Sequence, residues 1–141
     1  KTAQIFINNL NTKDGYEVVE YLKRRGINEH LIHKFRLGYS TNNKNSLLKQ
    51  IRQDGYKVDV MKQSGLFIDT ANGYIDRFRE RIIFSIFDST GNICGFAGRI
   101  FDLNDSAKYV NSPETLIYNK SRILKQVGLK VLKKKMIQTC P

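Results

Sequence analysis

The segment Asp76–Phe87, DRFRERIIFSIF, decides the fold that this sequence predicts. From Ile82 onward it is a long apolar run, and the polar turn Asp88–Asn92 leads into a second apolar run, Ile93–Phe101, ICGFAGRIF. Two runs of β-branched and aromatic residues on either side of a short turn are typical of paired strands. We therefore predict two adjacent strands, whose apolar character implies a sheet that helices cover on at least one face.

On the N-terminal side of this pair, the chain has the periodicity of amphipathic helices. The predicted helices are Ala3–Leu10, Tyr16–Lys23, Glu29–Phe35, a helix from Asn45 or Ser46 to Gly55, and Val58–Gln63. Gly26 is a C-cap position after the second helix, and Asn28 is an N-cap for the third. We place a loop at Gly38 and the polar run Ser40–Asn45.

After Gly65 the apolar residues recur with a period of about 2, which indicates strands. Leu66–Ile68 and Tyr74–Ile75 form a predicted hairpin across the turn dipeptide Asn72-Gly73. At the other end of the chain, Arg122–Lys135 is predicted to be a final helix with its basic residues outward. The expected fold class is α+β: a helical N-terminal half, then a small, mainly antiparallel sheet packed with helices, in a single domain over residues 1–141.

The composition fits a globular, basic protein with a polyanionic partner. Of the 141 residues, 40% are hydrophobic, which is enough for a core and unlike a disordered tail. Lys and Arg (24 residues) exceed Asp and Glu (13 residues), for a net charge of +11. This surplus favours nucleic acid as the partner, with an anionic membrane surface or simple solubility as alternatives. The sequence contains no apolar run of bilayer length and no secretory core, so we expect a cytoplasmic protein.

Three arginines in the first strand region are the leading candidates for phosphate contacts. If the segment is extended, Arg77, Arg79 and Arg81 share one face at a spacing of roughly 6.6 Å. Three like charges in a row oppose folding unless an anion balances them, and the planar guanidinium group binds phosphate through two parallel hydrogen bonds. The alternative is that Asp76, Glu80 or a neighbouring strand pairs with these arginines.

A second group of candidates follows the second strand. Arg99 comes after small residues that would let a ligand approach the backbone, although the same glycines could make room for a packed helix. Lys108, Tyr109 and Asn111 combine a charge, a stacking face and a bidentate amide, which suits a nucleotide or a single strand. The turn at Ser112–Glu114 is a predicted helix N-terminus that favours anions, and the alternative is an ordinary Asn-Ser-Pro turn with a surface lysine.

The sequence predicts no metal site and no catalytic residue within this chain. Cys94 and Cys140 lie far apart without close histidine partners, while His30 and His33 have no third ligand near them. Phosphoryl transfer usually needs clustered carboxylates around divalent ions, and neither a Glu-Gly-x-x-Asp nor an Asp-x-Asp pattern occurs. A Walker loop and a nucleophile elbow are also missing.

The candidate residues belong to a longer, ordered series of motifs. The series is YLKRRG at 21–26, FRLGY at 35–39, GL at 65–66, DRFRER at 76–81, GR at 98–99, KYVNSPET at 108–115 and NK at 119–120. In this order the motifs resemble the bacterial DnaG-type DNA primases, in the N-terminal part of their RNA polymerase core. The resemblance extends over residues 16–122, which is most of the chain.

The resemblance implies an enzyme that copies single-stranded DNA into short RNA primers during replication. It implies Mg²⁺ or Mn²⁺ in a TOPRIM domain and Zn²⁺ in an amino-terminal domain, both outside this chain. The implied partners are the single-stranded DNA template, nucleoside triphosphates, the RNA primer and the replicative helicase, at the bacterial nucleoid. The resemblance implies that a cleft is faced by Arg25, Arg77, Arg99, Lys108, Tyr109, Asn111 and Lys120. Arg79 and Arg81 are candidate binding residues as members of the arginine triplet.

The sequence departs from that family at several positions. Ser85 and Ala107 stand where the family has prolines, Ala97 replaces a second glycine before Arg99, and Leu124-Lys125-Gln126 replaces Leu-Tyr-Gly. The chain stops before any TOPRIM carboxylate, so we expect an excised or truncated piece of a primase that cannot polymerise alone. Two other hypotheses stay open: a non-catalytic module that binds single-stranded nucleic acid, and a basic structural protein of a ribonucleoprotein.

Overall fold

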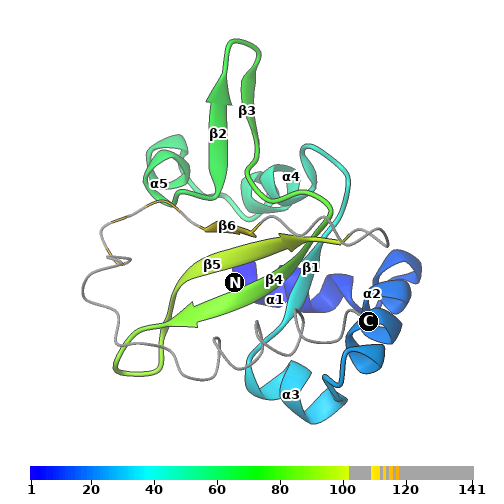
Figure 1. The fold of residues 1–141 in the computed structure, drawn as a ribbon. Coiled ribbons are helices and arrows are strands. Elements are labelled where there is room, and N and C mark those ends of the chain that lie inside the picture. Colours follow the sequence, from blue (N-terminus) through cyan, green and yellow to red (C-terminus); the bar gives the residue numbers. More distant parts are fainter. Residues whose placement is uncertain (102–108, 112, 114, 116, 118–141) are drawn as a thin grey trace.

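The computed structural model describes residues 1–101, 109–111, 113, 115 and 117, and Figure 1 shows their arrangement. The elements are α1 (Thr2–Asn9), α2 (Lys13–Arg24), α3 (Glu29–Lys34), β1 (Gly38–Ser40), α4 (Ser46–Gln53), α5 (Val58–Gln63), β2 (Phe67–Thr70), β3 (Gly73–Asp76), β4 (Arg81–Phe87), β5 (Ile93–Ile100) and β6 (Tyr109–Asn111). The predicted α+β class, with helices first and antiparallel strands after them, is confirmed. Among the described residues, no helix is long and apolar enough to cross a bilayer.

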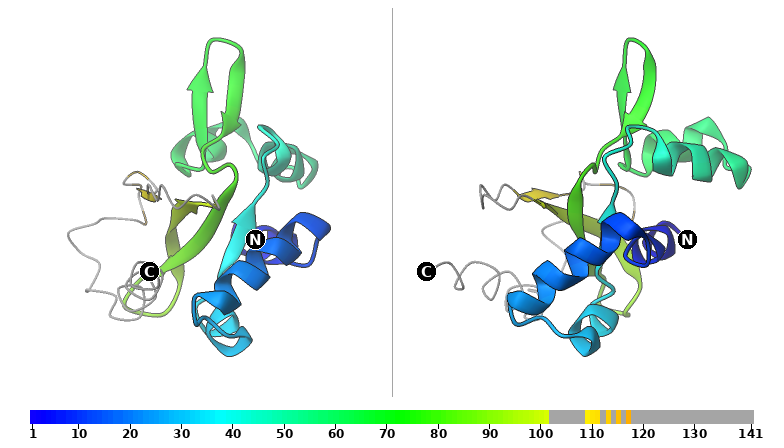
Figure 2. Two further views of the ribbon diagram at one scale, coloured as in Figure 1. Left: turned by 45° about the vertical axis from the view of Figure 1, so that its right-hand side comes forward. Right: turned by 90° about the vertical axis from the view of Figure 1, so that its right-hand side faces the viewer.

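Four strands form one antiparallel sheet in the order β1-β4-β5-β6, and β2 and β3 form a separate hairpin. The two predicted central strands, β4 and β5, pair along their length, with Ile82 opposite Arg99 and Phe84 opposite Ala97. On the outer side of β5, Arg99 is the register partner of Tyr109 in β6. The β2–β3 hairpin stands out from the rest of the chain in every view (Figures 1 and 2).

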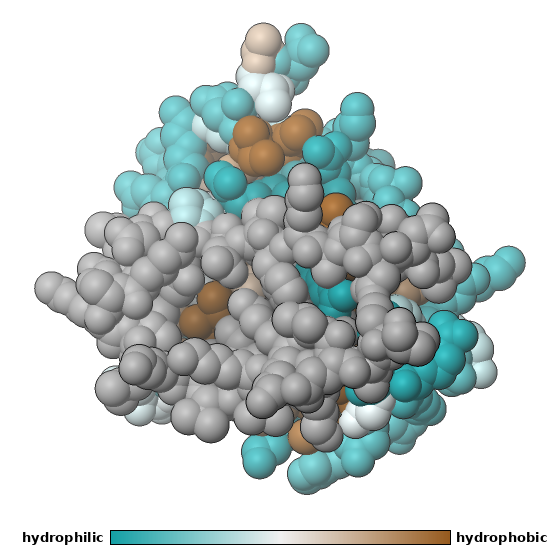
Figure 3. Space-filling model, in the orientation of Figure 1, coloured by the Kyte–Doolittle hydropathy of each residue, from teal (hydrophilic) through white to brown (hydrophobic). Residues whose placement is uncertain are grey.

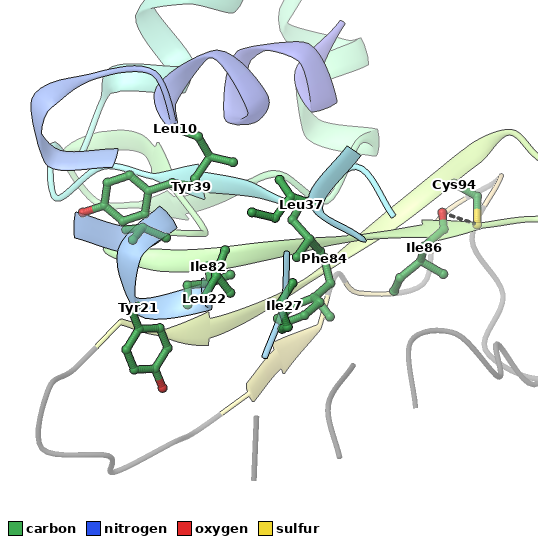
Figure 4. Packing of buried hydrophobic residues seen from close by; sticks show 13 residues of the cluster. Leu10, Tyr21, Leu22, Ile27, Leu37, Tyr39, Ile82, Phe84, Ile86 and Cys94 are labelled. Atoms are coloured by element: carbon green, nitrogen blue, oxygen red, sulfur yellow. Dashed lines mark hydrogen bonds between the residues drawn. The ribbon is translucent and has the colours of Figure 1, made fainter. Parts of the chain in front are cut away.

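Hydrophobic side chains cover both faces of the four-stranded sheet. Along β4, Ile82, Phe84 and Ile86 belong to one buried cluster and Ile83 belongs to another, because alternate residues of a strand point to opposite faces. The first cluster packs against α2 and α3 and is drawn in Figure 4. The second packs against α1, α4 and α5. The sheet is therefore fixed between two helical layers.

Local signals set the ends of the N-terminal helices. Asn28 caps α3 as predicted, because its Oδ1 accepts a hydrogen bond from the backbone N–H of Leu31 (3.0 Å). Gly26 follows α2 with φ +79°, as its predicted role at the helix end requires. The second helix begins earlier than expected, at Lys13, because the Thr12 hydroxyl accepts a hydrogen bond from Gly15 N–H.

Two expectations about loops were wrong. Gly38 lies in strand β1, opposite Ile83, and a Cβ atom placed there would be 2.6 Å from the Cβ atom of Phe6. This glycine lets α1 approach the edge strand closely. The hairpin loop is Ala71–Asn72, while Gly73, with φ +106°, is the first residue of β3. The final helix predicted at 122–135 lies outside the described residues.

Candidate nucleic-acid interface

The three arginines of the DRFRER segment gather around one cavity. Residues 77–80 are not a strand: the chain bends there, and Glu80 has φ +51°. The expectation of an extended segment was therefore wrong. The bend nevertheless brings the three arginines to a common cavity of about 230 Å³, which we call the arginine cavity. Its lining residues are Asn42, Arg77, Arg79, Glu80 and Arg81.

Backbone carbonyl groups hold two of these side chains in place. The Nε–H of Arg77 donates to the Gly65 carbonyl (2.7 Å), and its backbone N–H donates to the Leu66 carbonyl (2.9 Å). Arg81 Nη1 donates a longer hydrogen bond to the Gly98 carbonyl (3.4 Å). In both Arg77 and Arg81, one nitrogen of the guanidinium group is thus held by a backbone carbonyl group.

Three arginines and one carboxylate, Glu80, line the arginine cavity, so its positive residues outnumber its negative one. Burial, and then the neighbouring charge of Arg79, hold the pKa of Arg81 below its ordinary value. Both causes disfavour the charged form, and a bound phosphate would oppose them.

Asp76, one of the carboxylates that could have neutralised the arginines, caps helix α4 instead. Its two oxygens accept hydrogen bonds from the backbone N–H groups of Leu47 (2.8 Å) and Leu48 (3.0 Å). Asp76 is 3% exposed. Burial raises its pKa, and the two backbone hydrogen bonds and the charge of Arg79 act against that rise. Its carboxylate therefore stabilises the start of α4.

Arg99 lies on the other face of the sheet from Arg81. It is directly opposite Ile82, whereas Arg81 is opposite Ile100, and directly paired residues share a face. Arg99 is 2% exposed and its face carries the cluster that packs against α2 and α3. The structure therefore places Arg99 apart from the arginine cavity, although both are at the same end of the β4–β5 pair.

Arg25 lies at this same end, on the side of Arg99. Its guanidinium carbon is 5.2 Å from the ring centroid of Tyr21. That ring contacts Phe101, two residues beyond Arg99, with centroids 5.4 Å apart. Figure 4 shows the Tyr21 hydroxyl pointing away from the buried cluster. The predicted site residues with described side chains thus form two groups, the arginine cavity and the pair Arg25 and Arg99.

Gly98 fills a packing role. A Cβ atom there would be 2.7 Å from Cδ1 of Phe78 and 2.9 Å from Cδ of Arg81. The alternative that this glycine makes room for a packed helix was therefore wrong, because the neighbours are the Phe78 ring and the Arg81 stem. Gly98 supports the arginine cavity by accommodating Arg81.

The described residues of the KYVNSPET segment lie near members of both groups. In strand β6, Tyr109 is the register partner of Arg99, and Asn111 is the register partner of Ala97. Further on, Pro113 and Thr115 lie against Gly65, the residue that holds Arg77. Lys108 and Lys120 are outside the described residues.

Sequence reasoning missed two contributors to the site. Asn42 lines the arginine cavity from the polar loop after β1, where no motif marked it. Gly65 was part of the GL motif, but nothing in the sequence indicated that its carbonyl group would hold Arg77. On the face seen in Figure 3, the described surface is mainly hydrophilic. The larger cavity of about 950 Å³ between α1, α5 and the β4–β5 turn contains none of the predicted site residues.

Metal ligands do not gather in the described part of the chain. No group of three or more His, Cys, Asp or Glu side chains lies together there. His30 and His33 are both exposed on α3, and Cys94 is a buried free thiol. The described residues therefore do not fit a divalent ion or a structural zinc ion.

Comparison with known proteins connects this geometry to one family. Residues 5–129 match the family described as DNA primase catalytic core, N-terminal domain. A DNA primase of Listeria monocytogenes is 37% identical over 116 residues, covering 82% of this chain and 18% of that protein. A DNA primase of Enterococcus faecalis is 35% identical over 131 residues, covering 88% of this chain and 21% of that protein. The chain thus spans about a fifth of the length of these relatives.

Solved structures agree in fold. The RNA polymerase domain of Mycobacterium tuberculosis primase DnaG has a TM-score of 0.78 and 31% identity, covering 86% of this chain and 40% of that one. A DnaG primase catalytic domain bound to single-stranded DNA has a TM-score of 0.77 and 31% identity, covering 86% of this chain and 38% of that one. The chain therefore belongs to the family of the N-terminal domain of the DNA primase catalytic core.

Proposed function

We propose that this chain is the template- and nucleotide-binding wall of a DNA primase, acting within a longer protein that synthesises RNA primers on single-stranded DNA. The observation that carries the proposal is the convergence of Arg77, Arg79 and Arg81 on one cavity. The names of the relatives support primer synthesis over a non-catalytic binding module. The chain alone, which spans about a fifth of those relatives, is expected to bind but not to polymerise.

The arginine cavity is suited to the phosphates of a polyanion. Guanidinium groups donate in a fixed planar fork that matches phosphate oxygens, and charge-assisted hydrogen bonds of this kind are about twice as strong as neutral ones. The repulsion between Arg79 and Arg81 is present before any ligand binds. A bound phosphate would oppose this repulsion, which would favour binding at the cavity.

The second group would act on the other side of the same sheet end. Arg25 and Arg99 would supply charge, and Lys108, Tyr109 and Asn111 would add a further charge, a stacking ring and a bidentate amide for an unpaired base. Lys120 would extend this basic strip. The proposed ligands are the single-stranded template, the incoming nucleoside triphosphate and the RNA primer, and the proposed partner of the longer protein is the replicative helicase.

The metals of the reaction would be held elsewhere in the longer protein. Mg²⁺ or Mn²⁺ would stabilise the charge that develops on the transferred phosphoryl group, and Zn²⁺ would have a structural role in a separate domain. Within this chain the basic side chains bind and orient the phosphates. No chemical step is assigned to them.

The proposal is tested by binding of the chain to a labelled single strand over a salt series. On a single strand, each lost phosphate contact should flatten the slope of log K against log salt by roughly 0.7. We expect Arg79→Gln to lower the affinity and flatten the slope, and the double variant Arg99→Ala with Lys108→Ala to do the same. Arg52→Gln removes an exposed arginine of α4 and is the charge-matched control. If the slopes of the site variants equal that of Arg52→Gln, these residues are not the phosphate-binding site.

A further inference from the structure

We infer that Gly65 is a positioning residue for the proposed phosphate-binding arginine, Arg77, and that it ties this arginine to the segment that follows β6. This inference rests on the proposed function of Arg77. Gly65 lies between α5 and β2 and is buried. It therefore does not contact a ligand, and its effect on binding would pass through the groups that it touches.

The first link is the carbonyl group of Gly65. It accepts the Nε–H of Arg77 at 2.7 Å, while the next carbonyl, of Leu66, accepts the Arg77 backbone N–H at 2.9 Å. The two hydrogen bonds hold the Arg77 backbone and the Nε edge, and so restrict the orientation of the guanidinium group. The end with the two terminal nitrogens is then left to bind a phosphate bidentately. A lysine in place of Arg77 would keep the positive charge but lose both the Nε hydrogen bond and the two parallel donors of the guanidinium group.

The second link is the missing side chain of Gly65. A Cβ atom there would be 2.8 Å from Cγ and 3.0 Å from Cδ of Pro113, and 3.2 Å from Cγ2 of Thr115. The proline ring is rigid, so it cannot give way by rotating. The lack of a side chain at Gly65 thus makes room for Pro113 and Thr115. Both residues follow β6, in which Asn111 is the register partner of Ala97.

Other glycines allow the two requirements at Gly65 to be separated. Gly65 has φ +71°, and Gly55, after helix α4, has φ +81° with nothing within 4 Å of an added Cβ atom. Alanine at either position adopts the same unfavourable left-handed backbone. Only at Gly65 does alanine also meet Pro113 and Thr115. Gly55→Ala is therefore a matched control for backbone strain.

The experiment measures the affinity of the 141-residue chain for a labelled oligothymidine strand, with urea unfolding of each variant beside it. We expect Gly65→Ala to weaken binding roughly tenfold, the effect of losing one charge-assisted hydrogen bond, and Gly55→Ala to leave binding unchanged. Adding Pro113→Ala to Gly65→Ala removes the main clash and should restore most of the affinity. In an Arg77→Ala background, Gly65→Ala should have no further effect on binding.

The possible failures are distinguishable. If Arg77→Ala alone binds like the wild type, the proposed function of Arg77 fails. If Arg77→Ala weakens binding but Gly65→Ala is neutral, or adds its full effect to Arg77→Ala, the proposed function stands and the positioning role is overturned. If Gly65→Ala does not fold, Arg77→Lys decides. Affinity near that of Arg77→Ala supports the positioning role, and wild-type affinity overturns it.

Discussion

The capping of α4 by Asp76 predicts that Asp76→Ala destabilises the fold by about 3 kcal/mol. The carboxylate lies 2.8 and 3.0 Å from the backbone nitrogens of Leu47 and Leu48, each of which is 4% exposed. Loss of an N-cap typically costs 0.5 to about 2 kcal/mol, and a buried donor left without a partner costs roughly 1 to 3 kcal/mol. Asn45, the N-cap residue of α4, makes no side-chain capping hydrogen bond that could compensate.

Urea unfolding followed by circular dichroism measures this cost. With a slope of roughly 1 to 3 kcal/mol per molar urea for a small domain, the midpoint should fall by about 1 to 3 M. Asp69→Ala, at an exposed position in the same hairpin, is the control and should change the unfolding free energy by less than about 0.5 kcal/mol. Asp76→Asn keeps one acceptor oxygen and should lie between the two. If Asp76→Ala and Asp69→Ala unfold at the same urea concentration, the carboxylate does not support α4.

Two further predictions concern the β4–β5 pair. Gly98→Ala would place a methyl group 2.7 Å from Phe78 Cδ1 and should lower the unfolding free energy by about 1 to 3 kcal/mol in the same urea assay; an unchanged value would mean that the ring can move aside. In the turn between the strands, the Thr90 hydroxyl and nearby backbone N–H groups hold the pKa of Asp88 below its ordinary 3.8. The folded chain therefore favours the ionised carboxylate. The excess in unfolding free energy over the Asp88→Asn variant should be full above pH 3.8 and disappear as the pH falls through the lower pKa of the folded state. A constant difference between the two proteins across a pH series would contradict this.

The helical half was predictable because its signals are local. Asn28 and Gly26 mark helix ends by side-chain capping and by a left-handed backbone, which depend on a few adjacent residues. Strand β1 was missed because it has three residues and exists through its pairing with β4. A segment of three residues followed by a polar run is not a sequence pattern that indicates a strand. The close approach of α1 at Gly38 is likewise a contact between distant segments.

The candidate site was predictable in its residue types more than in its geometry. Alternation along an extended strand was the wrong reason to group Arg77, Arg79 and Arg81, because a bend at Glu80 places them around one cavity. The burial of Arg99 follows from its register opposite Ile82, and register is set by pairing that the sequence does not state. The contact between Gly65 and Pro113 joins residues far apart in the chain, which no local pattern indicates.

The most direct test of the arginine cavity is to observe the arginine Nε–H signals of the ¹⁵N-labelled chain by NMR during titration with oligothymidine, with each signal assigned by substitution. The account predicts that the signals of Arg77, Arg79 and Arg81 shift together with a common affinity, while those of the exposed Arg24 and Arg52 stay in place. Saturation of binding with the three cavity signals unmoved, or shifts confined to Arg24 and Arg52, would contradict it.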